Sequence, residues 1–171
     1  VLDRILPVED HEISTFAQKT FVKQGIKIKT SSKVLGLKKD ATGIDVSMDT
    51  NGVVDTLKVD KVILAVGIIA NTEEIGLEKT KIKTESGHIM IDQWCETDEP
   101  GIFAIGDVTG GPWLAHKASH EGVVCVEKIA GIKGAHPLNM QNIPGCTYSR
   151  PQIASVGMTQ TEAESSGYKV K

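Results

Sequence analysis

The sequence predicts an α/β protein, because apolar strands, amphipathic helices and an exposed antiparallel sheet follow one another along the chain. Two short segments, Val62–Val66 and Ile102–Ile105, are apolar throughout, as strands buried on both faces must be. The segment Glu9–Gln24 has apolar side chains at spacings of three and four, which is typical of a helix. A second helix is predicted over Trp113–Ala130, with Gly131 as its cap. Buried strands with helices between them indicate α/β architecture.

The composition excludes several classes of protein. The 171 residues carry a formal net charge of −3, and 40% of them are hydrophobic, which are ordinary globular values. No run of Lys and Arg marks a basic patch, so a nucleic-acid partner is not expected. No apolar run reaches the ~18 residues that a membrane span needs. The three cysteines are odd in number and far apart, which favours a reducing compartment over a disulfide framework.

The first half of the chain predicts a helix followed by a small sheet. Acidic residues suit the start of the helix over Glu9–Gln24, and Gly25 suits its C-terminal cap. A strand is expected at Ile26–Ile28. An antiparallel meander of three strands should follow, because Asn51-Gly52 is a strong hairpin signal; its strands are predicted at Lys33–Lys39, Gly43–Met48 and Val53–Val59.

The second half predicts shorter elements. A strand is expected at His88–Ile91, and Gly134–Gly145 is interpreted as a linker. Another strand is expected at Ile153–Val156. A final helix should begin at Thr159, where the pattern Thr159-x-x-Glu162 predicts a capping box.

The most informative chemistry lies around residues 100–116. The apolar run Ile102–Ile105 ends at Gly106-Asp107, and ligands of open α/β sheets bind beyond the carboxyl ends of strands. Gly106 lacks a Cβ and can admit a ligand to the backbone. Asp107 offers an acceptor for a sugar or ribitol hydroxyl, although the simpler interpretation of an isolated Gly-Asp is a turn cap.

The following Gly110-Gly111-Pro112 loop runs into the predicted helix. The first amides of a helix have no intrahelical partner and carry partial positive charge, so they suit an anion or a ring that becomes anionic. A flavin becomes anionic at its pyrimidine edge when it is reduced. Asp107 on a ribitol and the helix start on the ring would together form half of a flavin site, which the order of the two segments favours over a plain loop–helix junction.

With these segments in view, the sequence resembles the dihydrolipoamide dehydrogenases, within the pyridine nucleotide–disulfide oxidoreductase family. The resemblance covers essentially the whole chain. It rests on Leu2–Pro7, Asp60-Lys61-Val62, Ala65-Val66-Gly67 with Asn71-Thr72, Ala104–Val108, Leu114–Ala118, Ile143-Pro144 and the pattern from Tyr148 to Thr159. The Gly-Asp strand is shared by many flavoproteins, whereas Leu114–Ala118 points more narrowly to the lipoamide enzymes.

The resemblance implies a set of site residues and domains. FAD would be bound by Gly106 and by Asp107 at its ribitol, and its isoalloxazine ring would be lined by Trp113, Leu114, Ala115 and His116, mainly through backbone groups. NAD would contact Val34 and Gly67. The implied fold is a partial FAD/NAD(P)-binding, Rossmann-like (three-layer ββα) pair of domains with the antiparallel meander, plus the start of an α+β dimerisation domain. The implied borders are 1–71 for the NAD domain, 72–143 for the FAD domain and 144–171 for the interface domain.

Several family features are absent from the sequence. It has no G-x-G-x-x-G, no C-x-x-x-x-C redox pair and no His-Pro-Thr, since His136-Pro137 is followed by Leu138. We therefore expect an internal part of a protein roughly two to three times longer, without catalytic residues of its own and able to self-associate through uncovered apolar strands. Ile68 and Ala70 stand where the family usually has Arg and Pro, and Trp113 replaces a usual Met. Trp113 could pack on the flavin edge or on a neighbouring subunit.

Other polar clusters have simpler interpretations. His116 and His120 lie four residues apart beside Glu121, but a solvated or flavin-facing pair is favoured over a metal site. Cys125 is predicted to be a small buried hydrophobe, and Cys95 and Cys146 to be partly exposed. A group of lysines is predicted to form a solvated face; it comprises Lys23, Lys27, Lys29, Lys33, Lys38 and Lys39.

The resemblance implies an NAD-dependent flavoenzyme that reoxidises dihydrolipoamide and contributes to cell redox homeostasis. The implied partners are a second subunit, in a homodimer, and the lipoyl domains of 2-oxo acid dehydrogenase complexes. The implied location is the bacterial cytoplasm or the mitochondrial matrix. Two alternatives stay open: a related disulfide reductase acting on mercuric ion, glutathione or oxygen, and a non-enzymatic FAD-binding or assembly module.

Overall fold

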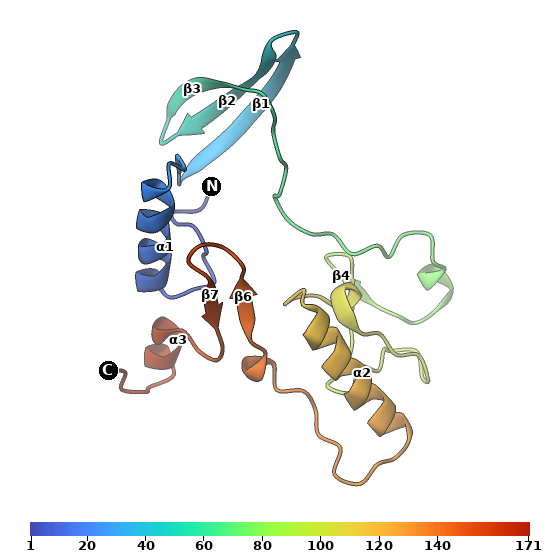
Figure 1. Ribbon diagram of the computed structural model, residues 1–171. Helices are drawn as coiled ribbons and strands as arrows, with labels where there is room; N and C mark the ends of the chain where they lie inside the picture. The colour runs from blue at the N-terminus through green and yellow to red at the C-terminus, as the bar shows by residue number, and fades with distance from the viewer. The chain divides into compact units, whose positions relative to one another are not determined.

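The chain folds into two compact units, which Figure 1 shows with their helices and strands. The computed structural model describes residues 1–171. Unit 1 comprises Val1–Ala65 together with Pro144–Lys171, and unit 2 comprises Val66–Ile143. The domain borders predicted after residues 71 and 143 stay predictions. The assignment of domains to NAD, FAD and dimerisation stays a prediction. None of the helices is long and apolar enough to cross a membrane.

Unit 1 begins with helix α1 (His11–Lys23), where a helix was predicted. Ser14 and Ala17 form its buried side. Gly25 follows the helix with a φ of +94°, the left-handed conformation that a C-terminal glycine cap adopts. The predicted strand at Ile26–Ile28 does not form. The amide of Ile26 bonds to the carbonyl of Phe21 at the helix end instead, and no strand of this chain pairs with the segment.

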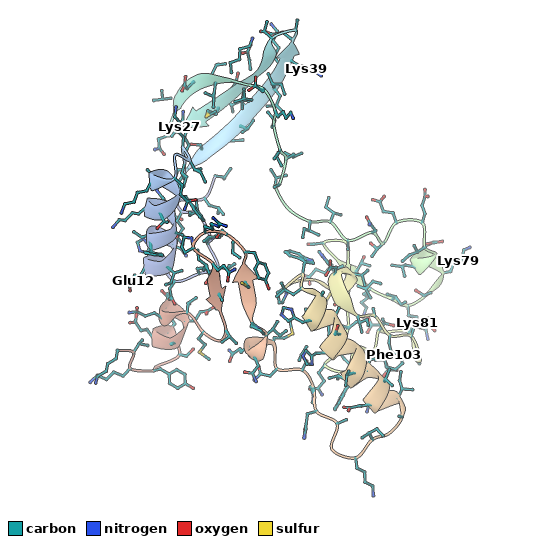
Figure 2. The ribbon with its side chains drawn as sticks, in the orientation of Figure 1. Glu12, Lys27, Lys39, Lys79, Lys81 and Phe103 are labelled. Carbon is teal, nitrogen blue, oxygen red and sulfur yellow. The ribbon has the colours of Figure 1, made fainter.

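The predicted meander is confirmed. Strands β1 (Ser32–Asp40), β2 (Gly43–Thr50) and β3 (Val53–Val59) pair antiparallel in the order β1-β2-β3. Asn51 and Gly52 have φ values of +54° and +85°, as the tight hairpin between β2 and β3 requires. The predicted lysine face is also confirmed, because all six of its side chains are exposed; Figure 2 labels Lys27 and Lys39.

The end of the chain completes unit 1. Strands β6 (Gly145–Thr147) and β7 (Ile153–Ser155) form a hairpin, and helix α3 (Gln160–Ser165) follows. The capping box predicted at Thr159 and Glu162 is present, with both of its hydrogen bonds. Two contacts join this end to the start of α1: the Ser155 hydroxyl lies 3.1 Å from Glu9 Oε1, and the Gln160 amide donates to Asp10 Oδ1 at 2.7 Å.

Unit 2 is built around helix α2 (Ala115–Ile129). Before it come a two-stranded hairpin, β4 (Thr84–Glu85) with β5 (His88–Ile89), and a short 3₁₀ helix, η2 (Gly106–Thr109). Two further 3₁₀ turns, η1 (Leu77–Lys79) and η3 (Met140–Asn142), lie near its ends, and η3 falls within the predicted linker. The predicted helix start at Trp113 is two residues early, because Leu114 is extended (φ −136°, ψ 130°) and acts as the N-cap.

The two wholly apolar segments are not strands, so this prediction is wrong. Ile63 and Val66 are 91% and 85% exposed, and Val62–Val66 has no regular structure. The segment Ile102–Ile105 makes one bridge, between Phe103 (labelled in Figure 2) and Glu96. A parallel strand is stable only when neighbouring strands satisfy its backbone groups on either side. No other segment of this chain supplies those neighbours.

Candidate functional site

The loop that carries Asp107 is a compact turn. Asp107 lies in η2, and its carbonyl accepts a hydrogen bond from the Gly110 amide at 3.2 Å. The Thr109 hydroxyl donates to the Gly106 carbonyl at 2.8 Å, which closes the same turn. The Asp107 carboxylate is exposed and has no hydrogen-bond or ion-pair partner in the chain. It is therefore held by its backbone, with its side chain available to a ligand.

Gly106 is required by packing against α2. Its φ is +80°, and a Cβ built on it would lie 3.3 Å from the Cβ of Ala118. Any other residue would be strained and would push the turn away from the helix. The prediction that Gly106 also lets a ligand approach the backbone stays a prediction, and the packing against α2 gives this glycine a second reason.

The second part of the candidate site is the start of α2, which follows the Asp107 turn in the chain. The N-cap residue Leu114 has no side-chain acceptor, and the first bond of the helix runs from the Ala118 amide to the Leu114 carbonyl at 3.2 Å. No side chain therefore caps the first-turn amides from the N-cap position. Their partial positive charge is the property that suits an anionic group.

Trp113 lies on the approach to this helix start. Its ring is 6.0 Å from that of His88 in β5, at an interplanar angle of 37°. The Nε2 atom of His88 is buried without a hydrogen-bond partner. Trp113 itself is 43% exposed, so its indole offers an open aromatic surface beside His88.

The sequence analysis did not predict the two side chains that hold the loop of Asp107 against α2. Lys117 and Glu121 are buried charged side chains on α2, and their Nζ and Oε1 atoms lie 2.9 Å apart. Glu121 Oε2 accepts the Gly106 amide at 2.7 Å, and Lys117 Nζ donates to the Gly110 carbonyl at 3.0 Å. One signal in the sequence could have predicted their burial. Lys117 and Glu121 are four residues apart, and Val124 and Cys125 follow at spacings of three and four, so all four residues lie on one side of the helix.

These features fit a flavin nucleotide. An unpartnered carboxylate can accept a ribitol hydroxyl, uncapped helix amides can face a ring edge that becomes negative, and an exposed indole can contact the ring. The contact between η2 and α2 brings Asp107 and the helix start to one part of unit 2. Gly106, Asp107, Trp113, Leu114, Ala115 and His116 all belong to this unit.

Comparison with known proteins decides the family. The sequence profile of the pyridine nucleotide-disulphide oxidoreductases matches residues 1–122. The chain belongs to this family. It is 48% identical over 169 residues to a dihydrolipoyl dehydrogenase of Zymomonas mobilis, and 45% identical over 171 residues to one of Bacillus subtilis. These alignments cover 98% and 99% of the chain and 36% of each relative, so the chain spans about a third of their length.

Solved structures of the family confirm the predicted α/β fold class. A crystal structure of LpdA from Mycobacterium tuberculosis superposes with a TM-score of 0.86 at 26% identity, over 96% of this chain and 35% of the other. The flavoprotein disulfide reductase RclA from Escherichia coli has the same fold, with a TM-score of 0.87 at 24% identity. FAD and NAD, the predicted cofactors, are the cofactors of this family of oxidoreductases.

The two residues expected to contact NAD lie in different units. Val34 is an exposed residue of β1, beside a register shift between Val34 and Gly36, and belongs to unit 1. Gly67 belongs to unit 2, and a side chain built on it would meet open space. Ala70, at a position where the family usually has Pro, is buried, whereas Ile68 is 51% exposed. The contacts to NAD stay a prediction.

The other polar residues considered in the sequence analysis are Glu121, beside two histidines, and the three cysteines. Glu121 is directed at Lys117 and Gly106, so its carboxylate is not available to join His116 and His120 around a metal ion. Cys125 is buried and Cys146 exposed, as expected, but Cys95 is only 4% exposed, so that part of the prediction is wrong. Burial, reinforced by the negative charge of Glu121, raises the pKa of Cys95 to about 11. The Cys95 thiol therefore stays protonated and unreactive at neutral pH.

Proposed function

We propose that this chain is the part of a dihydrolipoyl dehydrogenase that holds the ribitol and the pyrimidine edge of FAD. The whole protein would reoxidise dihydrolipoamide through a redox disulfide and FAD and reduce NAD⁺. One observation carries the proposal: an exposed carboxylate without a partner, Asp107, is fixed by η2 beside the uncapped start of α2. The names of relatives at 45–48% identity support the choice of substrate.

Each residue of the site has a defined task in this proposal. When bound, FAD supplies the redox chemistry between thiols and the nicotinamide. Asp107 accepts a hydrogen bond from a ribitol hydroxyl and so fixes the chain of the cofactor. The first-turn amides of α2, at Ala115 and His116, favour negative charge at the pyrimidine edge. Trp113 covers part of the ring and keeps water from it.

In this proposal the redox thiols and the proton acceptor do not belong to this chain. Its three cysteines are far apart in sequence, and Cys95 and Cys125 are buried. Those groups would come from the rest of the protein. We further propose a homodimer that serves the lipoyl domains of 2-oxo acid dehydrogenase complexes, in the bacterial cytoplasm or the mitochondrial matrix.

The test is the FAD content of the full-length protein with Asp107→Ala. We expect the ratio of flavin absorbance to protein to fall well below that of the parent, while the unfolding midpoint of the apoprotein stays close to it, because Asp107 makes no side-chain bond within the chain. Asp98→Ala is the matched control, since Asp98 is another surface carboxylate of unit 2 and pairs with Lys83. Equal FAD content in the Asp107→Ala variant and the parent would remove the basis of the proposal.

The activity of the same protein distinguishes the substrates. Reduction of NAD⁺ by dihydrolipoamide supports the proposal. A preference for mercuric ion, glutathione or oxygen would place the protein elsewhere in the family, and a colourless full-length protein without activity would identify a non-enzymatic module.

A further inference from the structure

The buried ion pair of α2 holds both ends of the turn that carries Asp107. The side chains of Lys117 and Glu121 are only 3% and 6% exposed. At the first end of the turn, Glu121 Oε2 accepts the Gly106 amide at 2.7 Å. At the other end, Lys117 Nζ donates to the Gly110 carbonyl at 3.0 Å. The same Nζ lies 3.4 Å from both the Gly106 carbonyl and the Thr109 hydroxyl.

Burying two charges between a helix and a turn is energetically unfavourable. Each ion loses its hydration, and an apolar pair of similar volume often stabilises a protein equally well. An apolar pair, however, gives no donor for the Gly110 carbonyl and no acceptor for the Gly106 amide. The charged pair does both, so it fixes the turn at two points that lie on either side of Asp107.

The same two points also control the start of α2. Gly110 leads directly into the loop that ends at Trp113, and Lys117 lies in the first turn of the helix. The distance between the Asp107 carboxylate and the helix amides therefore depends on these bonds. Neither charge is free for the cofactor, because both are buried in the contact between η2 and α2.

We propose that Lys117 and Glu121 are positioning residues for FAD, which set Asp107 and the start of α2 at the spacing that the cofactor requires. The inference rests on the proposed function and deepens it. It assigns to the ion pair an effect on FAD affinity that is separate from its effect on the stability of the apoprotein.

The test uses the full-length protein and two double variants. In Lys117→Met with Glu121→Leu, apolar side chains replace the pair, and both backbone bonds are lost. In Lys117→Met with Glu121→Gln, the Gln carbonyl can still accept the Gly106 amide. Lys83→Met with Asp98→Asn is the matched control, because it removes an exposed pair (3.0 Å; side chains 76% and 46% exposed) of the same unit.

Two quantities are measured for each protein: the unfolding midpoint of the apoprotein, and the Kd for FAD by titration of flavin fluorescence. We expect the Met/Leu variant to have a lower unfolding midpoint, because the Gly106 amide and the Gly110 carbonyl lose their partners. Its Kd should rise about tenfold, which is more than in proportion to the lost apoprotein stability, because the positioned groups are no longer held. The Met/Gln variant should recover part of this loss, and the control should leave the Kd unchanged.

An unchanged Kd in the Met/Leu variant would overturn the inference, as would a Kd that rises only in proportion to lost apoprotein stability across the variants. Should the Met/Leu variant fail to fold, the Met/Gln variant decides by the same criteria. The Asp107→Ala variant separates this failure from failure of the proposed function. Loss of FAD in Asp107→Ala with normal affinity in both double variants contradicts the ion-pair inference alone.

Discussion

Two lysine–carboxylate pairs of similar length have opposite surroundings in this protein. In the meander, Lys58 Nζ lies 2.7 Å from Asp40 Oδ2, and both side chains are more than 40% exposed. In unit 2, Lys117 and Glu121 are 2.9 Å apart and almost completely buried. Water and salt screen the first pair, so it contributes little to stability. The second pair is not screened, and removal of one partner leaves a charge buried without compensation.

The two pairs also differ in what they connect. Asp40 is bonded to its own turn, through the amide and hydroxyl of Thr42 at 2.6 and 2.8 Å, and to Lys58 in the same small sheet. Glu121 and Lys117 connect a helix to a turn that lies up to 15 residues away in sequence. A change in the first pair is therefore expected to stay local, whereas a change in the second should reach Asp107.

The largest effect is expected from Glu121→Ala. This change leaves the Lys117 ammonium buried and the Gly106 amide without an acceptor, so the free energy of unfolding should fall by about 3–5 kcal/mol. Urea denaturation of the full-length protein measures it, with Asp40→Ala as the exposed counterpart. A similar decrease in the free energy of unfolding for the two variants would show that burial does not make the Lys117–Glu121 pair more important for stability than the exposed pair.

A second effect is expected at Cys95. Its Sγ lies 3.7 Å from the Glu121 carbonyl, and the thiol is both buried and held protonated by its raised pKa. Alkylation of Cys95 in the folded parent should be slow compared with that of the denatured protein. Glu121→Ala should accelerate it, because opening of the contact between α2 and η2 exposes the thiol. Mass spectrometry of iodoacetamide-treated protein gives both rates, and equal protection in the variant and the parent would indicate that the contact survives without the carboxylate.

Much of the fold follows from local sequence signals. The Asn51-Gly52 turn, the alternating strands around it and the capping box at Thr159 are each determined by residues close in sequence, and each is present in the structure. The apolar segments Val62–Val66 and Ile102–Ile105 carry an equally clear signal, but a buried strand also needs partners, which local sequence does not supply.

In the candidate site, too, some features follow from local sequence signals and others depend on packing between distant residues. The Gly106-Asp107 turn and the Gly110-Gly111-Pro112 loop before α2 are both visible in the sequence, although the segment before the turn is not a strand and the helix begins two residues later than predicted. The Lys117–Glu121 pair was not predicted, because lysine and glutamate four residues apart on a helix are usually solvated. The structure shows that this side of α2 faces the protein, because Gly106 packs against Ala118 and the charged pair is bonded to the turn.

The smallest effect concerns the exposed pair and its dependence on pH. Lys58, and then Thr42, lower the pKa of Asp40 from 3.8 to about 2. Because the folded-state pKa lies below the unfolded value, the stability that this carboxylate contributes is complete above about pH 4 and is lost as the pH falls towards 2. Lys58→Met should raise the titration midpoint of the Asp40 carboxyl carbon, measured by NMR, part of the way towards 3.8, because the bonds from Thr42 remain. The urea midpoint at neutral pH should decrease only slightly, because water and salt screen the exposed pair. A midpoint that stays near 2 in this variant would assign the low pKa to the turn with Thr42 instead. In that case the exposed pair would have no detectable energetic role, and the contrast with Lys117 and Glu121 would be complete.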